Sequence, residues 1–445
     1  MKQSGWFKQG WLEKIWSKKL QSGLKITLIN LLVLFVFLEL GSLIFYFFRN
    51  QQLFYTRERT EDYRDLGVNL EGVRFGTTVA ERLHPFFGFV HQPGPDFRVG
   101  FKYNNYGFIS PYDYPFVKEN DNQFIVGVFG GSVASNYSIY EVQSKLLEQA
   151  IQKQPGFESK EVIILSFAVG GYKQPQQMLI LNYLLSMGQE FDLVINLDGF
   201  NEVALNTLNN KRQLALSMPS ASHIEPLTSL ANNSLSEKAM RTLLKIKDNK
   251  QKIGNSLESL QHCWLASCYA INSLRTQVLV KDYRKNLQRF ERQRLSPDDE
   301  SGSIIYFYTQ NDRIPDEEFY QQAASYWGKT SMLMSQILAE NDIPYLHVLQ
   351  PNQYWQTERQ FNEAEKEIAF SENSPYEKGV RIGYPFLLDE VKNLQQNQIN
   401  ILNAVNIFDQ ESEPVYTDNC CHYNPKGEEI LSNFIAQEAV KQIQE

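Results

Sequence analysis

Four polar groups in this sequence have the residue types that acyl transfer requires. Ser132 stands directly after Gly130-Gly131, and a second glycine pair, Gly170-Gly171, lies further along the chain. Asn201 and His422 follow in that order. A serine hydroxyl attacks an ester carbonyl once a histidine takes its proton, while backbone N–H groups and an asparagine amide stabilise the oxyanion. The residue types therefore predict a site built on a nucleophilic serine.

The stretches that must position these residues have the pattern of a buried parallel sheet. Near-continuous apolar runs that alternate with helical stretches predict an α/β fold whose sheet is covered on both faces. Ligands of such sheets bind beyond the carboxyl ends of the strands, where Ser132, Gly171 and Asn201 would lie. The predicted strands are Phe124–Phe129, Val162–Ala168, Leu193–Gly199, Ile343–Gln350 and Val405–Asp409, with a helix over about 316–340 before the fourth.

The ordered set resembles the motifs of the SGNH (GDSL-type) hydrolase superfamily, which is named after Ser, Gly, Asn and His from four blocks. The resemblance implies that Ser132, here in Gly-Gly-Ser rather than Gly-Asp-Ser, is the nucleophile and that His422 is the base. Gly171, with Gly170 as the alternative, and Asn201 match the oxyanion-hole residues, together with the Ser132 amide. The resemblance covers about residues 122–445 and implies a three-layer α/β/α sandwich with a flavodoxin-like parallel sheet.

The acid of the triad departs from the family pattern. The family usually carries an aspartate three residues before the histidine, but Asn419 occupies that position and Asp418 lies four residues before His422. An extra residue can loop out at Cys420-Cys421 so that Asp418 still orients His422. Alternatively, a backbone carbonyl holds His422 and Asp418 points away.

Each residue of the set also has an ordinary structural interpretation. Ser132 can be the N-cap of the following helix, which serine fills well. Asn201 can be a turn residue, followed by Glu202 where the family usually has aspartate, and His422 a surface histidine. Under this interpretation the domain is an inactive SGNH-like module that binds a polymer or a partner.

A long apolar segment near the N-terminus predicts a membrane anchor. Residues 26–48 are long enough to span a bilayer and lack the cleavage pattern of a signal peptide. The tail over residues 1–25 carries six lysines and one acid, so the positive-inside rule predicts a cytoplasmic N-terminus and a periplasmic or extracellular main domain. Glu39 lies inside the span, where it either contacts another membrane helix or stays protonated.

Composition argues against several other functions. The net charge of −8 provides no basic face for nucleic acid. His84 and His91 lack further ligands at metal-binding spacing. With no phosphate-binding loop either, we expect neither a metal nor a cofactor.

The rest of the chain predicts accessory segments. Residues 49–121 are expected to form a linker and a short β preface, and "NNYG" within it predicts a turn between two extended pieces. Residues 206–303 interrupt the sheet pattern with one or two amphipathic helices, either a lid, a docking arm or a structural hairpin. The four cysteines suggest disulfides in an oxidising compartment, but their number leaves the pairing open. One hypothesis is a cross-link from Cys263 or Cys268 in the insertion to Cys420 or Cys421 beside His422, since a bond between the adjacent Cys420 and Cys421 is strained.

Together these features predict a membrane-anchored, extracytoplasmic serine esterase that removes acyl groups, especially acetyl, from a carbohydrate or cell-envelope polymer. An O-acyltransferase that acts on exopolysaccharide through the same acyl-enzyme is the alternative, since the two differ in the nucleophile of the second step. The expected partners are the acylated substrate, or another small ester, and the bilayer around residues 26–48.

Overall fold

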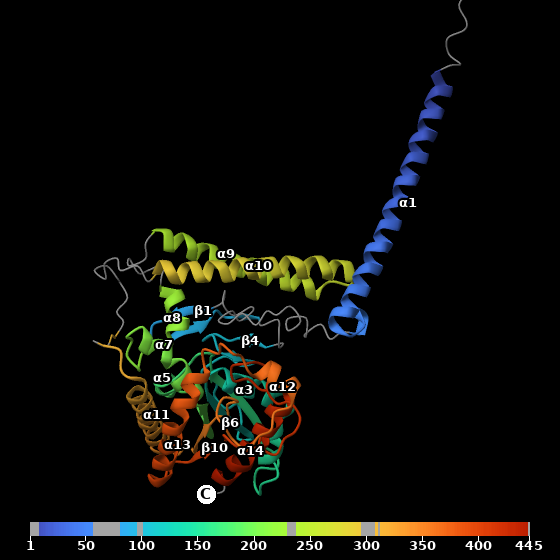
Figure 1. Ribbon diagram of the computed structural model, residues 1–445. Helices are drawn as coiled ribbons and strands as arrows, with labels where there is room; N and C mark the ends of the chain where they lie inside the picture. The colour runs from blue at the N-terminus through green and yellow to red at the C-terminus, as the bar shows by residue number, and fades with distance from the viewer. Residues whose placement is uncertain are drawn as a thin grey trace, which may run out of the picture. The chain divides into compact units, whose positions relative to one another are not determined.

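The computed structural model describes residues 9–56, 81–95, 101–228, 237–294, 308–309 and 312–443 (Figure 1). The chain divides into two compact units. The helical unit comprises Met1–Phe75 and Arg241–Ser296, and the sheet unit comprises Gly76–Met240 and Pro297–Glu445. Much of the expected linker, residues 57–80, lies outside the described residues.

A five-stranded parallel sheet forms the centre of the sheet unit. Its spatial order is β10-β9-β8-β6-β7, which is the flavodoxin-like order 2-1-3-4-5 of a doubly wound sheet. In such sheets the ligand crevice lies where the strand order reverses, here outside the carboxyl ends of β6 and β8. The strands are β6 (Gln123–Gly130), β7 (Glu161–Ala168), β8 (Leu193–Asp198), β9 (Tyr345–Leu349) and β10 (Ile401–Asn403).

The first four predicted strands are confirmed, but the position of the fifth is wrong. The fifth strand is Ile401–Asn403, which pairs in parallel with β9, and Val405–Asp409 lies in a turn. The strand ends at Asn403 because its side-chain oxygen accepts a hydrogen bond from the Val405 N–H (3.2 Å) and turns the chain.

Helices pack on both faces of the sheet because alternate strand residues point to opposite sides. One core cluster joins Val126 and Val128 of β6 to α3, α4 and α14. A second joins Ile125 and Phe129 to α5 and the C-terminal part of α11. The helices of this unit are α3 (Ser132–Ser144), α4 (Leu146–Ile151), α5 (Gln176–Ser186), α6 (Phe200–Ala204), α7 (Asn206–Lys211), α8 (Ala221–Thr228), α11 (Asp316–Ala339), α12 (Glu363–Ala369), α13 (Glu377–Gln396) and α14 (Pro425–Gln442).

A β preface packs against the second cluster. The turn predicted at "NNYG" is confirmed, since the Asn104 side chain accepts hydrogen bonds from the N–H groups of Tyr106 and Phe108 (both 3.0 Å). Phe108 then packs on Phe167 of β7. The preface consists of one hairpin, β1 (Glu81–His84) with β2 (Gly88–His91), and three short antiparallel strands, β3 (Gly94–Pro95), β4 (Lys102–Tyr103) and β5 (Ile109–Ser110).

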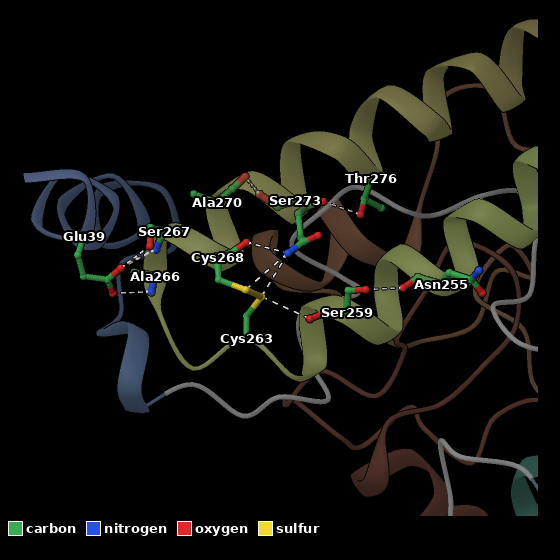
Figure 2. Close-up of a disulfide and its surroundings, with 11 residues drawn as sticks. Glu39, Asn255, Ser259, Cys263, Ala266, Ser267, Cys268, Ala270, Ser273 and Thr276 are labelled. Atoms are coloured by element: carbon green, nitrogen blue, oxygen red, sulfur yellow. Dashed lines mark hydrogen bonds between the residues drawn. A yellow bond between two sulfur atoms is a disulfide. The ribbon is translucent and has the colours of Figure 1, made fainter. Parts of the chain in front are cut away.

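The helical unit contains α1 (Gln9–Asn50), the short η1 (Phe54–Thr56), most of α9 (Glu237–Gln261) and α10 (Ala266–Arg294). In the described part of the chain, one helical segment, Lys25–Phe48, is long and apolar enough to cross a membrane. A disulfide joins Cys263 to Cys268 across the turn between α9 and α10, with Cα atoms 5.6 Å apart (Figure 2). The hypothesis of a cross-link from the insertion to the histidine loop is therefore wrong, because Cys263 and Cys268 bond to each other and neither Cys420 nor Cys421 belongs to a disulfide.

Candidate active site

Ser132 lies at the sharp turn between β6 and α3. Gly130 adopts φ +143°, and a Cβ there would lie 2.1 Å from the Leu197 carbonyl oxygen of β8. A Cβ on Gly131 would lie 2.3 Å from the Asn201 amide nitrogen. The two glycines therefore let the turn press against β8 and Asn201. Gly131 is the N-cap of α3 and Ser132 its first residue, so the interpretation of Ser132 as a helix cap is wrong.

A continuous hydrogen-bonded chain joins Ser132 to His422 and Asp418. His422 Nδ1 contacts the Asp418 carboxylate, and its Nε2 lies 2.7 Å from Ser132 Oγ. Because a carboxylate only accepts, Nδ1 carries the proton and the neutral ring accepts the serine hydroxyl at Nε2. This is the arrangement of a nucleophile, a general base and an orienting acid.

The histidine loop wraps around Asp418 despite its shifted position. Asp418 Oδ1 accepts hydrogen bonds from the N–H groups of Cys420, Cys421 and His422, at 2.9, 3.1 and 3.3 Å. These bonds curl the intervening residues, so an acid four residues before the histidine still reaches its ring. Both side chains remain about one-fifth exposed, at 20% for His422 and 23% for Asp418, so the pair borders solvent.

The electrostatics of the pair favour an ionised aspartate. Burial opposes this charge, but His422 and the hydrogen bonds from His422, Cys420 and Cys421 hold the pKa of Asp418 well below its usual range. Burial also opposes charge on His422, yet Asp418 and then Cys421 raise the pKa of His422 well above its usual value. Asp418 therefore stabilises the imidazolium that forms when His422 takes a proton.

Two further glycine turns lie near Ser132. The turn after β7 contains Gly170-Gly171, and the turn after β8 contains Gly199 and leads to Asn201. Asn201, in α6 after the Gly199 turn (φ +111°), donates through Nδ2 to the Tyr172 carbonyl at 2.7 Å. An amide nitrogen has two protons, so one remains for another acceptor. The Ser132 N–H, at the first position of α3, has no partner within its helix.

Gly171 is held in a conformation that suits glycine. It has φ +87°, and a Cβ there would lie 2.2 Å from Nε2 of His223 on α8. His223 in turn stacks on Phe89 of the preface at 4.9 Å. The preface and α8 thus fix the loop that carries Gly171. Sequence reasoning missed His223 because no local pattern links it to the glycine pair.

A second loop, after β9, holds the histidine loop. Asn352, Gln353 and Tyr354 donate side-chain hydrogen bonds to the carbonyls of Cys420 (2.9 Å), Asp418 (3.1 Å) and Asn419 (3.0 Å), respectively. The only sequence signal for this supporting role was that "QPNQYW" begins at the end of a predicted strand, and sequence reasoning did not assign the role.

Another Ser–His–Asp set lies in the core. His347 on β9 contacts Ser331 Oγ (2.7 Å) through Nδ1 and Asp198 Oδ1 (2.8 Å) through Nε2. Trp327 also donates to Asp198 at 2.6 Å. All of these side chains are buried, so no substrate reaches Ser331, and the set serves to tie β8, β9 and α11 together.

A buried carboxyl lies close to His422. Burial and then Glu141 raise the pKa of Glu428 to about 8, although the charge of His422 opposes this shift. Both carboxyl oxygens of Glu428 are buried without a hydrogen-bond partner. A neutral Glu428 is therefore favoured at neutral pH.

In the part of the chain that the structure describes, the side chains that could hold a metal overlap the triad. Ligand atoms of Cys420, Cys421 and His422 lie within 4.8 Å of one another. A hydrogen bond from Cys420 and the charge of His422 outweigh burial and lower the pKa of Cys421 to about 6. A metal there would occupy the ring that faces Ser132 and Asp418.

No protein-family model matches the sequence, and no curated protein matches it. Among solved structures, the chain is similar to a GDSL-like lipase from Bacteroides thetaiotaomicron, with 10% identity and a TM-score of 0.33 over 73% of this chain and 92% of that one.

Proposed function

We propose that the chain is an SGNH-type serine esterase with a three-layer α/β/α catalytic domain, anchored in a membrane, that removes acyl groups from a carbohydrate or cell-envelope polymer. The observation that carries this proposal is the partly exposed chain of hydrogen bonds from Asp418 through His422 to Ser132. Its position outside β6 and β8 supports it, because that is the ligand crevice of this sheet order.

Acylation of the enzyme uses each of these groups. Ser132 Oγ attacks the ester carbonyl carbon while His422 Nε2 takes the hydroxyl proton. The developing oxyanion accepts hydrogen bonds from the Ser132 and Gly171 N–H groups and the free Asn201 amide proton. His422 then gives its proton to the leaving alcohol oxygen as the ester bond breaks, which leaves an acyl-Ser132.

Deacylation repeats these steps with water. His422 takes a proton from the water that attacks the acyl-Ser132 carbonyl, and then returns a proton to Ser132 Oγ as the carboxylic acid leaves. Throughout, Asp418 keeps Nδ1 protonated so that Nε2 faces the reacting atoms. A sugar hydroxyl in place of water would make the reaction an acyl transfer.

A polymer substrate with sugar rings is supported by a surface hollow that the loop after β9 lines. Trp355, Arg381, Asn403 and Asn406 are among its lining residues, and Tyr354 joins this lining to the histidine loop. Amides and a guanidinium bind sugar hydroxyls, and an indole ring packs on sugar rings. Acetyl is the acyl group we favour for such a polymer.

Placement outside the cytoplasm is supported by two features. The Lys-rich tail before Lys25–Phe48 favours a cytoplasmic N-terminus. The Cys263–Cys268 disulfide is typical of an oxidising compartment.

Hydrolysis tests this proposal directly. The purified full-length chain in detergent should release nitrophenol from an aryl acetate and acetate from an O-acetylated polysaccharide, and Ser132→Ala should lose both activities while Ser135→Ala, on the same helix, keeps them. Adding an oligosaccharide acceptor separates hydrolysis from transfer, since a transferase would acetylate the acceptor. A folded wild type that cleaves no ester would contradict the proposal.

A further inference from the structure

The α9–α10 hairpin is tied to the candidate membrane helix at Glu39. The Glu39 carboxylate accepts hydrogen bonds from the N–H groups of Ala266 (2.6 Å) and Ser267 (3.0 Å) and from the Ser267 hydroxyl (2.6 Å) (Figure 2). Tyr46 of α1 also packs edge-on against Tyr269 of α10 at 5.3 Å. The carboxylate therefore satisfies the otherwise unpaired N–H groups at the start of α10.

The position of Glu39 along α1 determines where the start of α10 must lie. A helix needs about 20 apolar residues to cross the hydrocarbon core. Between Lys25 and Glu39 there are only thirteen residues, so a span that ended before Glu39 would be too short. If Lys25–Phe48 is the span, Glu39 lies inside it, about 13 Å from its C-terminal end at 1.5 Å per residue. The hydrogen-bonded Ala266 and Ser267 then lie inside the membrane as well.

The composition of the hairpin tip fits this location. Residues 263–274, "CWLASCYAINSL", contain no charged residue, and Arg275 is the first charge on α10. Ala266 and Arg275 are about 13 Å apart along the helix, which matches the depth of Glu39. On the α9 side the charge nearest to the tip is Glu258, so α9 would enter the membrane less deeply than α10.

One face of α10 exposes apolar side chains. Ile271, Leu274 and Val278 are 67%, 58% and 61% exposed and recur at the spacing of a single helix face. The opposite face of α10 is buried and includes Tyr269, Val280 and Tyr283. Trp264, in the turn beside the disulfide, is 74% exposed. An exposed stripe of this size next to a membrane span is suited to lipid rather than water.

The same face becomes basic further along α10. Lys281, Lys285 and Arg289 are exposed and continue the line of Val278. Residues 241–294 hold twelve Lys and Arg against four Asp and Glu, whereas the whole chain has a net charge of −8. A basic segment beside an interfacial apolar stripe binds anionic headgroups.

We propose that the α9–α10 hairpin is a membrane-binding arm. Its tip and the first two turns of α10 enter the leaflet on the side of the C-terminal end of α1, and the basic part of α10 binds anionic lipid headgroups. The bilayer is the occupant because the apolar face is continuous with the span through Glu39. This inference rests on the membrane-spanning role of α1 in the proposed function, and not on its catalytic part.

The depth of Trp264 tests the apolar part of the proposal. The full-length chain is reconstituted in liposomes with lipids brominated on their acyl chains, and the fluorescence of the wild type is compared with that of Trp264→Phe. The difference, which reports Trp264 alone, should be quenched at least twofold by the brominated chains. Quenching of that difference by aqueous acrylamide instead, with none by bromine, would overturn the proposal.

Lipid charge tests the basic part. Amide exchange in 266–290 should be of order tenfold slower in nanodiscs with phosphatidylglycerol than in phosphatidylcholine alone. Lys281→Gln with Lys285→Gln and Arg289→Gln should remove this difference. The control is a triple change on the sheet unit, Lys366→Gln with Lys392→Gln and Lys441→Gln, which should leave this difference in place.

Two outcomes would count against the proposal in different ways. If sodium carbonate releases the chain from membranes, the span itself fails and the arm with it. The chain could instead resist carbonate while the amide exchange rate of 266–290 is the same in both lipids and falls when an acidic polysaccharide is added. The basic face would then bind glycan, and the arm proposal would be overturned. Ester hydrolysis, measured on the same samples, reports the catalytic part independently.

Discussion

Replacing Asp418 separates a working triad from a serine–histidine pair. Asp418 contacts His422 Nδ1 and also accepts three backbone N–H bonds from its own loop. In Asp418→Asn the amide oxygen can keep the loop bonds, but the amide NH₂ then faces Nδ1. The imidazole is pushed to the tautomer that carries its proton on Nε2, which cannot accept the Ser132 proton.

The expected loss is large. In a serine triad, this change lowers kcat about 10⁴-fold through the wrong tautomer alone. We expect a loss of about 10³- to 10⁴-fold in kcat, with KM little changed, because Asp418 contacts the Nδ1 side of His422 and Ser132 lies at Nε2. Asp418→Ala should lose as much activity and also destabilise the loop, because its backbone N–H groups lose their acceptor.

The residual activity carries a second signature. The Asp418 carboxylate raises the pKa of His422, and a general base works only when it is neutral. The kcat/KM of the wild type should therefore rise with pH through a value above 6.5, and in Asp418→Asn this rise should move to lower pH. The assay is aryl acetate hydrolysis from pH 5 to pH 10, with the unfolding midpoint as control. If folded Asp418→Asn and Asp418→Ala both keep near-wild-type turnover, a backbone carbonyl orients His422 and our assignment of Asp418 is wrong.

Three further changes test the surroundings of the site. Cys421→Ala should move the pH dependence of kcat/KM to lower pH, because Cys421 contributes to the raised pKa of His422, and an unchanged profile would exclude this coupling. Gly130→Ala should lower stability by about 3 kcal/mol, as a Cβ would meet the Leu197 carbonyl at 2.1 Å, whereas Gly156→Ala, at φ +84° in open space, should cost about 1 kcal/mol in chemical denaturation. The stability of Glu428→Gln relative to the wild type should increase from pH 5 to pH 9. The pKa of Glu428 is about 8 in the folded chain and lower in the unfolded chain, so the wild type loses stability as the pH rises through this window. The same difference in unfolding midpoint between the two proteins at pH 5 and at pH 9 would contradict this.

The strands could be predicted because each is an apolar run that ends at a glycine or polar turn. β6, β7 and β8 follow this rule, and the residues directly after them form one side of the site. The fifth strand was misplaced because both "INILN" and "VNIFD" are short β-like runs, and the choice depends on the turn at Asn403. Pairing with β9 decides which of the two runs becomes the strand, and the local sequence carries no information about that pairing.

The approach of His422 to Ser132 could be expected only from order along the chain. The geometry of Asp418 depends on three backbone N–H bonds inside its loop, which residue spacing does not specify. The supporting contacts of Asn352 and His223 come from segments far away in sequence. The disulfide partner of Cys263 was missed because its pairing depends on the turn between two helices rather than on compartment or cysteine count.

Whether Ser132 is a nucleophile is tested most simply by the mass of the chain after treatment with a fluorophosphonate. We expect one adduct on Ser132 in the wild type, none in Ser132→Ala, and slow labelling in Asp418→Asn. Ser132 would be no nucleophile if the folded wild type stayed unlabelled, or if Ser132→Ala were labelled equally well at another serine.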